Sequence, residues 1–466
     1  MTSRRVLIAL VILLIPAAVH AIWDQVESTL FAREVARIAA RHEPVSTVFR
    51  RFPLPTAEQR RAARIYAAAA NLASWRYQDE RRPRSRDDQV DAAFASGHAA
   101  VALEDLRREY VEGEPALDLL NLASRLDFAG FGSIAPELYE NASSLYELND
   151  VNCLRADILT ARGDAKSAAG ALIQSVRLQR TISREFYRGI AARRLFGSLR
   201  LVLRYAPPDP DTLLTLQRGF EKLPDEDDVA EQLEVERARL LGDFWPYPPD
   251  RPTWAFRPLM SARGVADTVG FVALRPLLTH AARGQFKPFE DAIAAAREPW
   301  PQKLDSRLAL MSQYRLNPDG SRTRTLLLDR AVAFMPPALA ILGLNYSLPT
   351  AGMNLAIRRT SIAALAAERY RRAHDGDAPR SLDALVPDYL AAVPQDPFSG
   401  QPLRYRRTAD SYVVYSVDVN RVDDGGVLYG FGSGSTARMR RADDPSPRDI
   451  GIRVPLASVT NDKTQH

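Results

Sequence analysis

The chain has 466 residues with ordinary hydrophobic and charged contents of 46% and 26%, which is enough for two or three domains with their own cores. Its net charge of +5 is small, and its Arg residues are mixed with Asp and Glu, which excludes the basic face of a nucleic-acid-binding protein. Cys153 is the only cysteine, so neither an intrachain disulfide nor a cysteine-based metal cluster can form within one chain.

Residues 1–23 have the pattern of a targeting segment. Arg4–Arg5 form a positively charged start, Val6–Val19 is almost wholly apolar, and Val19–Ala21 has the small residues that a signal peptidase reads. Two outcomes are open: cleavage after Ala21, or retention as a transmembrane signal anchor in the inner membrane with the chain facing the periplasm. Both outcomes predict a location in the cell envelope, outside the cytoplasm.

Residues 24–243 show helical periodicity throughout. Apolar residues such as Ala69 and Leu72 recur at helical spacing, and prolines and glycines fall between the periodic segments. This order of helix, short loop and helix predicts a helical-hairpin domain. Within it, Cys153–Ile182 resembles a tetratricopeptide-type hairpin. Two architectures stay open: a solenoid-like array with a concave surface for a partner, and an irregular bundle without a groove.

Residues 244–352 are predicted to form a second helical subdomain, which begins with a proline- and aromatic-rich linker. The later part of this region, 331–357, carries no charged residue, which would suit a second membrane span. It also contains Pro336, Pro337 and Pro349 together with several polar residues, whose polar groups would lack partners in lipid. The sequence therefore predicts helices buried against the preceding domain.

Residues 353–430 carry the densest set of local signals in the chain. A helix is predicted over Arg358–His374, and Gly376 is the glycine that ends it. The alternating pattern of Leu403–Val417 predicts a β-hairpin. In the tight turn before it, the Asp396 carboxylate is expected to accept backbone N–H bonds. Together these signals predict a small α+β module at the end of a mainly α chain.

The order of a long helix, an LxxLVPxYL turn, PxDPFSGxPLRYR, a YxxYSxxxN strand and a DDGG loop resembles the C-terminal domain of the major pseudopilin of type II secretion. The resemblance favours the retained anchor at the N-terminus, and it implies partners among envelope proteins, including components of a secretion apparatus. The residues that carry it are Leu382, Leu385, Val386, Pro387, Tyr389, Leu390, Pro394, Asp396, Pro397, Phe398, Gly400, Pro402, Tyr405, Tyr415, Ser416, Asp423, Asp424, Gly425 and Gly426.

The loop after the predicted hairpin gathers oxygen atoms within a few residues. Calcium takes about six to eight oxygen ligands, which flexible loops with carboxylates and carbonyls provide. In the pseudopilin family the corresponding loop binds calcium, so the resemblance implies calcium as the cofactor here. The candidate ligands are Asp418, Asn420, Asp423 and Asp424. The alternative is a plain polar turn in which Gly425 and Gly426 have positive φ.

Residues 431–466 mix charges, prolines and polar residues, which predicts a mobile tail. The sequence contains no GxSxG, HExxH, Walker or dinucleotide-binding motif. The first hypothesis is therefore a non-catalytic scaffold or interaction protein of the cell envelope. The alternative is an extracytoplasmic hydrolase with its site in the helical domain. A cleft with two carboxylates of perturbed pKa would favour the hydrolase, whereas a groove lined by apolar and Arg side chains would favour the scaffold.

Overall fold

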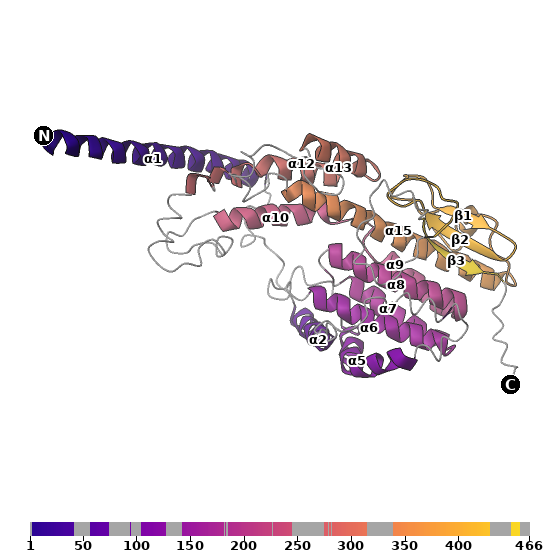
Figure 1. The fold of residues 1–466 in the computed structure, drawn as a ribbon. Coiled ribbons are helices and arrows are strands. Elements are labelled where there is room, and N and C mark those ends of the chain that lie inside the picture. The colour runs from indigo at the N-terminus through magenta and orange to yellow at the C-terminus, as the bar shows by residue number, and fades with distance from the viewer. Residues whose placement is uncertain are drawn as a thin grey trace. The chain divides into compact units, whose positions relative to one another are not determined.

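The computed structural model of this chain is mainly helical and has a small three-stranded antiparallel sheet (Figure 1), as the sequence predicts. It describes residues 2–41, 56–73, 94, 104–126, 142–180, 182, 185–225, 227–244, 275–277, 279–280, 282–314, 339–428 and 449–456. The chain divides into two compact units. Unit 1 comprises Met1–Arg51 and Asp228–Leu348, and unit 2 comprises Phe52–Asp227 and Pro349–His466.

Unit 1 is helical over its described residues. Its core includes a contact between Phe31 and Phe286, whose ring centroids lie 5.4 Å apart. On the surface, the Glu290 carboxylate accepts hydrogen bonds from Arg37 and Arg41, both at 2.7 Å. The helices of this unit are α1 (Thr2–Ala40), α10 (Val229–Phe244), α12 (Phe286–Arg297), α13 (Gln302–Gln313) and the first part of α15 (Leu339–Ala373).

The prediction of a transmembrane signal anchor is wrong. Over the part of the chain that the structure describes, no helix combines the length and the apolar character needed to span a bilayer. In the sequence, the apolar stretch of α1 ends before Asp24. The helix instead continues, charged residues included, to Ala40.

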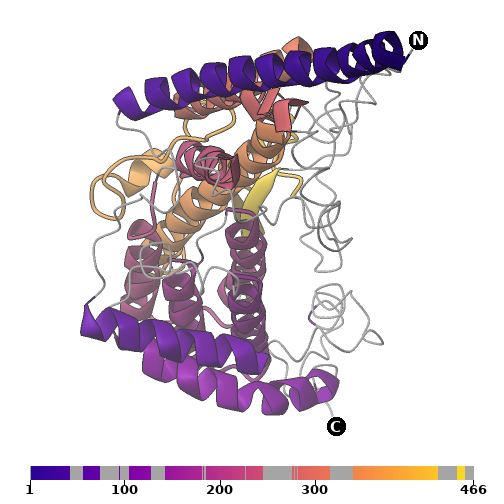
Figure 2. The same cartoon turned by 90° about the vertical axis from the view of Figure 1, so that its left-hand side faces the viewer.

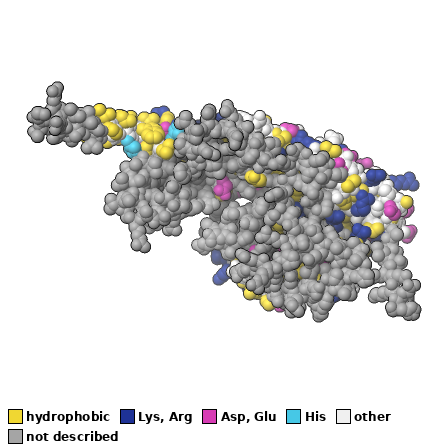
Figure 3. All heavy atoms as spheres, viewed as in Figure 1, with side chains coloured by type: hydrophobic (Ala, Val, Ile, Leu, Met, Phe, Trp, Pro, Cys, Tyr) yellow, Lys and Arg dark blue, Asp and Glu magenta, His cyan; other side chains and the backbone are white. Residues whose placement is uncertain are grey.

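The described side chains of α1 differ in burial. Leu14, Ile15 and Ile22 are exposed, and apolar side chains show as yellow spheres along this helix in Figure 3. Further along, the Glu27 carboxylate is buried and lies 2.9 Å from both His280 Nδ1 and Arg283 Nε. These contacts attach the second half of α1 to unit 1.

The uncharged stretch 331–357 is described from residue 339, where α15 begins. Ile341 and Leu348 are buried in unit 1, which agrees with the prediction of a buried helix. Pro349 lies inside α15, although the sequence predicts that the helix begins only at Arg358. Proline has no N–H, so the carbonyl four residues before it lacks its helical donor. That carbonyl belongs to Asn345, and Arg307 Nη1 of α13 donates to it at 3.2 Å.

Unit 2 contains a stack of antiparallel helices, in line with the predicted helical hairpins. Figures 1 and 2 show α2 and α5 side by side at the end of the stack. The turn between α6 and α7 is made by Gly163, with φ of +77°, and Asp164 caps α7 by accepting from Ser167 N at 3.1 Å. The stacked helices are α2 (Ala57–Ala73), α5 (Glu104–Ala123), α6 (Ala142–Ala161), α7 (Ala165–Gln179), α8 (Glu185–Tyr205) and α9 (Pro210–Glu221).

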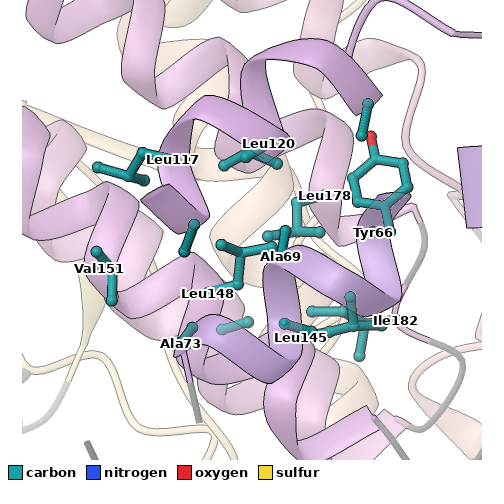
Figure 4. Packing of buried hydrophobic residues seen from close by; sticks show 14 of the residues in the cluster. Tyr66, Ala69, Ala73, Leu117, Leu120, Leu145, Leu148, Val151, Leu178 and Ile182 are labelled. Carbon is teal, nitrogen blue, oxygen red and sulfur yellow. The ribbon is translucent and has the colours of Figure 1, made fainter. Parts of the chain in front are cut away.

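A hydrophobic cluster between α2, α5 and α6 forms part of the core of this stack (Figure 4). Tyr66 of α2, Leu117 and Leu120 of α5, and Leu145 and Leu148 of α6 are each at most 2% exposed. A side chain of this size contributes about 1.5–3 kcal/mol when it is fully buried. The apolar residues whose spacing predicts these helices are therefore also the residues that pack the helices against one another.

The sheet is the second component of unit 2. Its strands are β1 (Arg404–Arg407), β2 (Ser411–Ser416) and β3 (Ile450–Pro455), in the order β1–β2–β3. The predicted hairpin is confirmed, because β1 pairs with β2 in an antiparallel register that places Arg404 opposite Tyr415. β3 lies inside the predicted tail 431–466, so that prediction is wrong for these residues. The rest of this tail lies outside the described residues, except for Asp449 and Leu456 beside the strand.

Asp396 fixes the turn that precedes the hairpin, as predicted. Its fully buried carboxylate accepts from Phe398 N and Ser399 Oγ of the turn, both at 3.0 Å. It also accepts from Ser416 Oγ at 2.7 Å and from Val417 N at 3.0 Å, at the end of β2. One carboxylate therefore ties the turn to the central strand. The predicted C-terminal glycine is also confirmed, since Gly376 has φ of +91° and its N–H donates to Arg371 O.

The α+β module packs directly on the helical stack within unit 2. Gln217 of α9 donates to the carbonyl of Tyr389 at 2.9 Å and accepts from Arg369 of α15 at the same distance. Strand β3 also contacts α8. The module and the last helices of the stack therefore share one core, and residues far apart in sequence meet at their junction.

Candidate functional site

A pocket lies at this junction, between the ends of α7 and α9, the first half of α8 and the second part of α15. Its cavity volume is about 60 Å³, enough for a few water molecules or one small side chain. The apolar wall includes Ala192 and Leu195 of α8, Phe220 and Leu223 at the end of α9, and Ala351 and Leu355 of α15. The polar lining residues are Gln179, Arg188, Asp227, Asn354 and Arg358. We call this cavity the Gln179 pocket.

Gln179 is the last residue of α7, and the helical period places it on a buried face. Leu172, Val176 and Gln179 recur at spacings of four and three residues, and all three are buried. The Gln179 side chain is only 3% exposed, and neither its Nε2 nor its Oε1 has a hydrogen-bond partner among the described residues. A buried carboxamide without partners costs about 1–3 kcal/mol for each unsatisfied group. The pocket therefore contains one donor group and one acceptor that a bound molecule can satisfy.

The two Arg residues of the pocket are parts of its wall. Arg188 donates from Nε and Nη2 to the carbonyl of Ile182, at 3.1 and 3.0 Å. Arg358 donates to the carbonyls of Phe220 and Glu221 at 2.9 and 3.0 Å, which places a cation at the negative C-terminal end of α9. Burial lowers the pKa of Arg358, and its ion pair with Asp225 opposes that shift.

Comparisons of this chain with family models, curated proteins and solved structures found no match.

Among the described residues, the lining of the pocket holds no pair of carboxylates. Asp227 is the single carboxylate among the lining residues that the structure describes. Asp150 and Asp157 of α6 do come together elsewhere in unit 2, but Arg194 binds both, at 2.9 and 2.7 Å. Asp157 has no exposed surface, and this burial raises its pKa against the opposing effect of Arg194. A substrate has no access to that carboxylate.

The predicted calcium ligands lie in one loop, but two of them are bonded to their own backbone. Asp418 is buried, has φ of +58°, and accepts from the N–H of Val419 at 2.6 Å. The side-chain oxygen of Asn420 accepts from Val422 N at 3.2 Å. The two glycines that follow, Gly425 and Gly426, have φ of +67° and +78°.

Asp423 and Asp424 lie near a third carboxylate, that of Asp449. Asp423 accepts from Arg404 Nε at 2.7 Å, from Tyr415 OH at 3.1 Å and from Gly425 N at 2.9 Å. Partial burial raises its pKa, but the Gly425 N–H and Arg404 outweigh burial and lower the pKa overall. Among the described residues, no three His, Cys, Asp or Glu side chains are grouped so that they could hold a metal ion. Calcium binding by this loop stays a prediction.

Sequence reasoning missed Asp449 as well as the Gln179 pocket. Asp449 is fully buried before β3, where its carboxylate accepts from the backbone N–H groups of Asp424 and Gly426 at 3.4 and 2.8 Å. Burial and the nearby Asp424 and Asp423 carboxylates raise its pKa to about 6. The alternation of Ile450, Ile452 and Val454 after it is a strand signal that could have located this residue.

Proposed function

We propose that this chain is a non-catalytic interaction protein of the cell envelope and that its Gln179 pocket binds a segment of a protein partner. The observation that carries this proposal is the lining of the pocket: apolar side chains from three elements, two Arg residues fixed in the wall, and a buried carboxamide. A small, mostly apolar cavity with a few convergent polar groups is the usual form of a recognition site. Helical stacks commonly present such sites to peptides and proteins.

The hydrolase alternative has weaker support. A hydrolytic site of the paired-carboxylate type needs two accessible carboxyl groups with different protonation states. The described lining of the pocket has one carboxylate, and the Asp150–Asp157 pair is occupied by Arg194. These observations favour the interaction protein over a hydrolase of this type.

The location of the chain and the ancestry of its module belong to the same proposal. The Arg4–Arg5 start and the small residues at Val19–Ala21 support export, with cleavage after Ala21. The order of α15, the Asp396 turn and the β1–β2 hairpin supports the likeness to a pseudopilin, and partners among secretion components follow from it. The mass of the mature N-terminus, measured on chain recovered from periplasmic extract, tests export. A full-length chain found only in the cytoplasm contradicts it.

In-cell photocross-linking tests the pocket as an interaction site. A photoreactive phenylalanine analogue replaces Leu223 at the rim, and mass spectrometry identifies the peptides that are joined to it. Filling the cavity with Ala192→Leu should remove these cross-links, because the isobutyl side chain occupies the space that the partner segment needs. The matched control places the same analogue at Leu122, which is 43% exposed on α5 and is not a lining residue of the pocket. Cross-links at Leu223 that persist in the filled variant contradict the proposal.

A further inference from the structure

We propose that the Gln179 pocket recognises the main chain of an extended, uncharged peptide: one peptide residue bonds to the Gln179 carboxamide and places a small apolar side chain in the cavity. This inference rests on the proposed function and names the chemistry of the partner segment. It is carried by the cavity itself and by the buried, unsatisfied side chain that lines it.

The hydrogen-bonding groups of the carboxamide decide the class of ligand. Oε1 of Gln179 requires a donor, and Nε2 requires an acceptor, because the amide carries both kinds of group. One residue of an extended peptide offers the same pair, its own N–H and its own C=O. A simple anion offers only acceptors, and a cation such as ammonium offers only donors. A peptide group therefore satisfies both atoms of Gln179 at once.

The charged residues around the pocket also disfavour an anionic ligand. Arg358 already donates to two carbonyls and pairs with Asp225, and Arg188 donates twice to Ile182 O. A bound carboxylate would compete with these acceptors for the two guanidinium groups. An uncharged ligand leaves all of these bonds in place.

The size and lining of the cavity limit the side chain that accompanies the peptide group. A volume of about 60 Å³ holds a small aliphatic group but not an aromatic ring together with its main chain. Leu195, Phe220 and Leu355 provide apolar contact for such a group. Because the hydrogen bonds go to the main chain, recognition depends on an extended conformation and on side-chain size rather than on one particular residue.

The probe that tests this inference is N-acetyl-L-valine N-methylamide, which presents one N–H, one C=O and one small apolar side chain at the central residue. Glutamine-specific ¹⁵N labelling of the full chain reports the carboxamide signals, and Gln179→Met identifies the Gln179 signal by its loss. We expect the probe to shift this signal at millimolar concentrations. The analogue that is N-methylated at the valine nitrogen lacks the donor, and we expect it to bind about tenfold more weakly, as one unmade hydrogen bond at a buried acceptor implies.

Several results would overturn the inference. They include no shift of the Gln179 signal up to about 50 mM probe, equal binding of the N-methylated analogue, and an equal shift with acetate, which would indicate an anion site. A lower melting temperature of Gln179→Met would also overturn it. The inference expects a higher one, because an unsatisfied buried amide is replaced by an apolar chain of similar length.

Cross-linking at Leu223 separates failure of this inference from failure of the proposed function. If Ala192→Leu removes the cross-links while Gln179→Met leaves them intact, the pocket binds a partner segment and only recognition of the main chain is wrong. If neither substitution changes the cross-links, the proposed function itself is wrong. Both proposals are supported if the cross-links are lost in both variants and the N-methylated probe binds about tenfold more weakly than the parent probe.

Discussion

Arg307 replaces a hydrogen bond that Pro349 removes from α15, and a double-mutant cycle can measure this compensation. Arg307 Nη1 donates to the Asn345 carbonyl at 3.2 Å and to the Asn345 side-chain oxygen at 2.9 Å. Asn345 is 2% exposed, so water is a poor substitute for the guanidinium. Loss of the donor in Arg307→Met is expected to destabilise the surrounding helices by about 1–3 kcal/mol.

The second perturbation restores the missing backbone donor. In Pro349→Ala the new N–H can bond the Asn345 carbonyl in the ordinary helical manner, and removal of a mid-helix proline is worth up to about 3 kcal/mol. Arg307→Met should then destabilise the helices less in the Pro349→Ala background than in the wild-type background. We expect a coupling free energy of about 1 kcal/mol or more, because one carbonyl has two alternative donors.

Hydrogen exchange read by mass spectrometry on peptides from α13 and α15 is the appropriate assay, since a chain of two units need not unfold in one step. Arg307→Met raises the exchange rate by some factor in each background, and a coupling of about 1.4 kcal/mol makes these two factors differ tenfold. Arg37→Met is the matched control: it removes a surface guanidinium of unit 1 that binds Glu290, and it should show no coupling with Pro349→Ala. A coupling below about 0.3 kcal/mol for Arg307 would refute the compensation.

Three further predictions concern the α+β module. Asp396→Asn should speed hydrogen exchange in β2 roughly 30- to 1000-fold (about 2–4 kcal/mol). The two carboxylate oxygens of Asp396 accept four hydrogen bonds, and asparagine keeps only one oxygen as an acceptor. The exposed Asp388→Asn is the control. Without added metal, β3 should be more stable at pH 5 than at pH 7.5. The folded pKa of Asp449, about 6, lies above the ordinary 3.8, so protonation favours the fold, and the change from pH 5 to pH 7.5 removes about 1.4 kcal/mol of stability. Asp449→Asn should flatten that profile, and an unchanged profile would contradict the assignment. Finally, if the Asp418–Asp424 loop binds calcium, millimolar calcium should raise the melting temperature of the wild type but not of Asp424→Asn, and the absence of a shift would discard the site.

Local signals in the sequence predict the elements that are built from local interactions. The Asp396 turn, the Gly376 helix end and the β1–β2 hairpin depend on residues close together in the chain, and all three are confirmed. The strand β3 was missed because its partner β2 lies more than thirty residues earlier, and prolines and charges before Ile450 outweighed a short alternating pattern. The passage of α15 through Pro349 was missed for a similar reason, since the compensating donor comes from Arg307 on another helix.

The candidate site could not be predicted from the sequence. Its lining comes from four separate parts of the chain, and Gln179 by itself has the pattern of an ordinary residue at the end of a helix. Its burial and its unsatisfied amide depend on the packing of α8, α9 and α15 around it. The calcium candidates, by contrast, are neighbours in sequence and were easy to identify, although the structure directs two of their side chains to backbone groups of the same loop.

The position of β3 after β1 and β2 in the sequence has a consequence for biosynthesis. Of the described elements β3 is the last to be translated, so β1 and β2 leave the ribosome before the strand that completes their sheet. A two-stranded ribbon is only marginally stable in water. The module should therefore close only after synthesis of the chain has passed Pro455, and a nascent chain that stops earlier leaves β2 with an open edge that proteases and chaperones can detect.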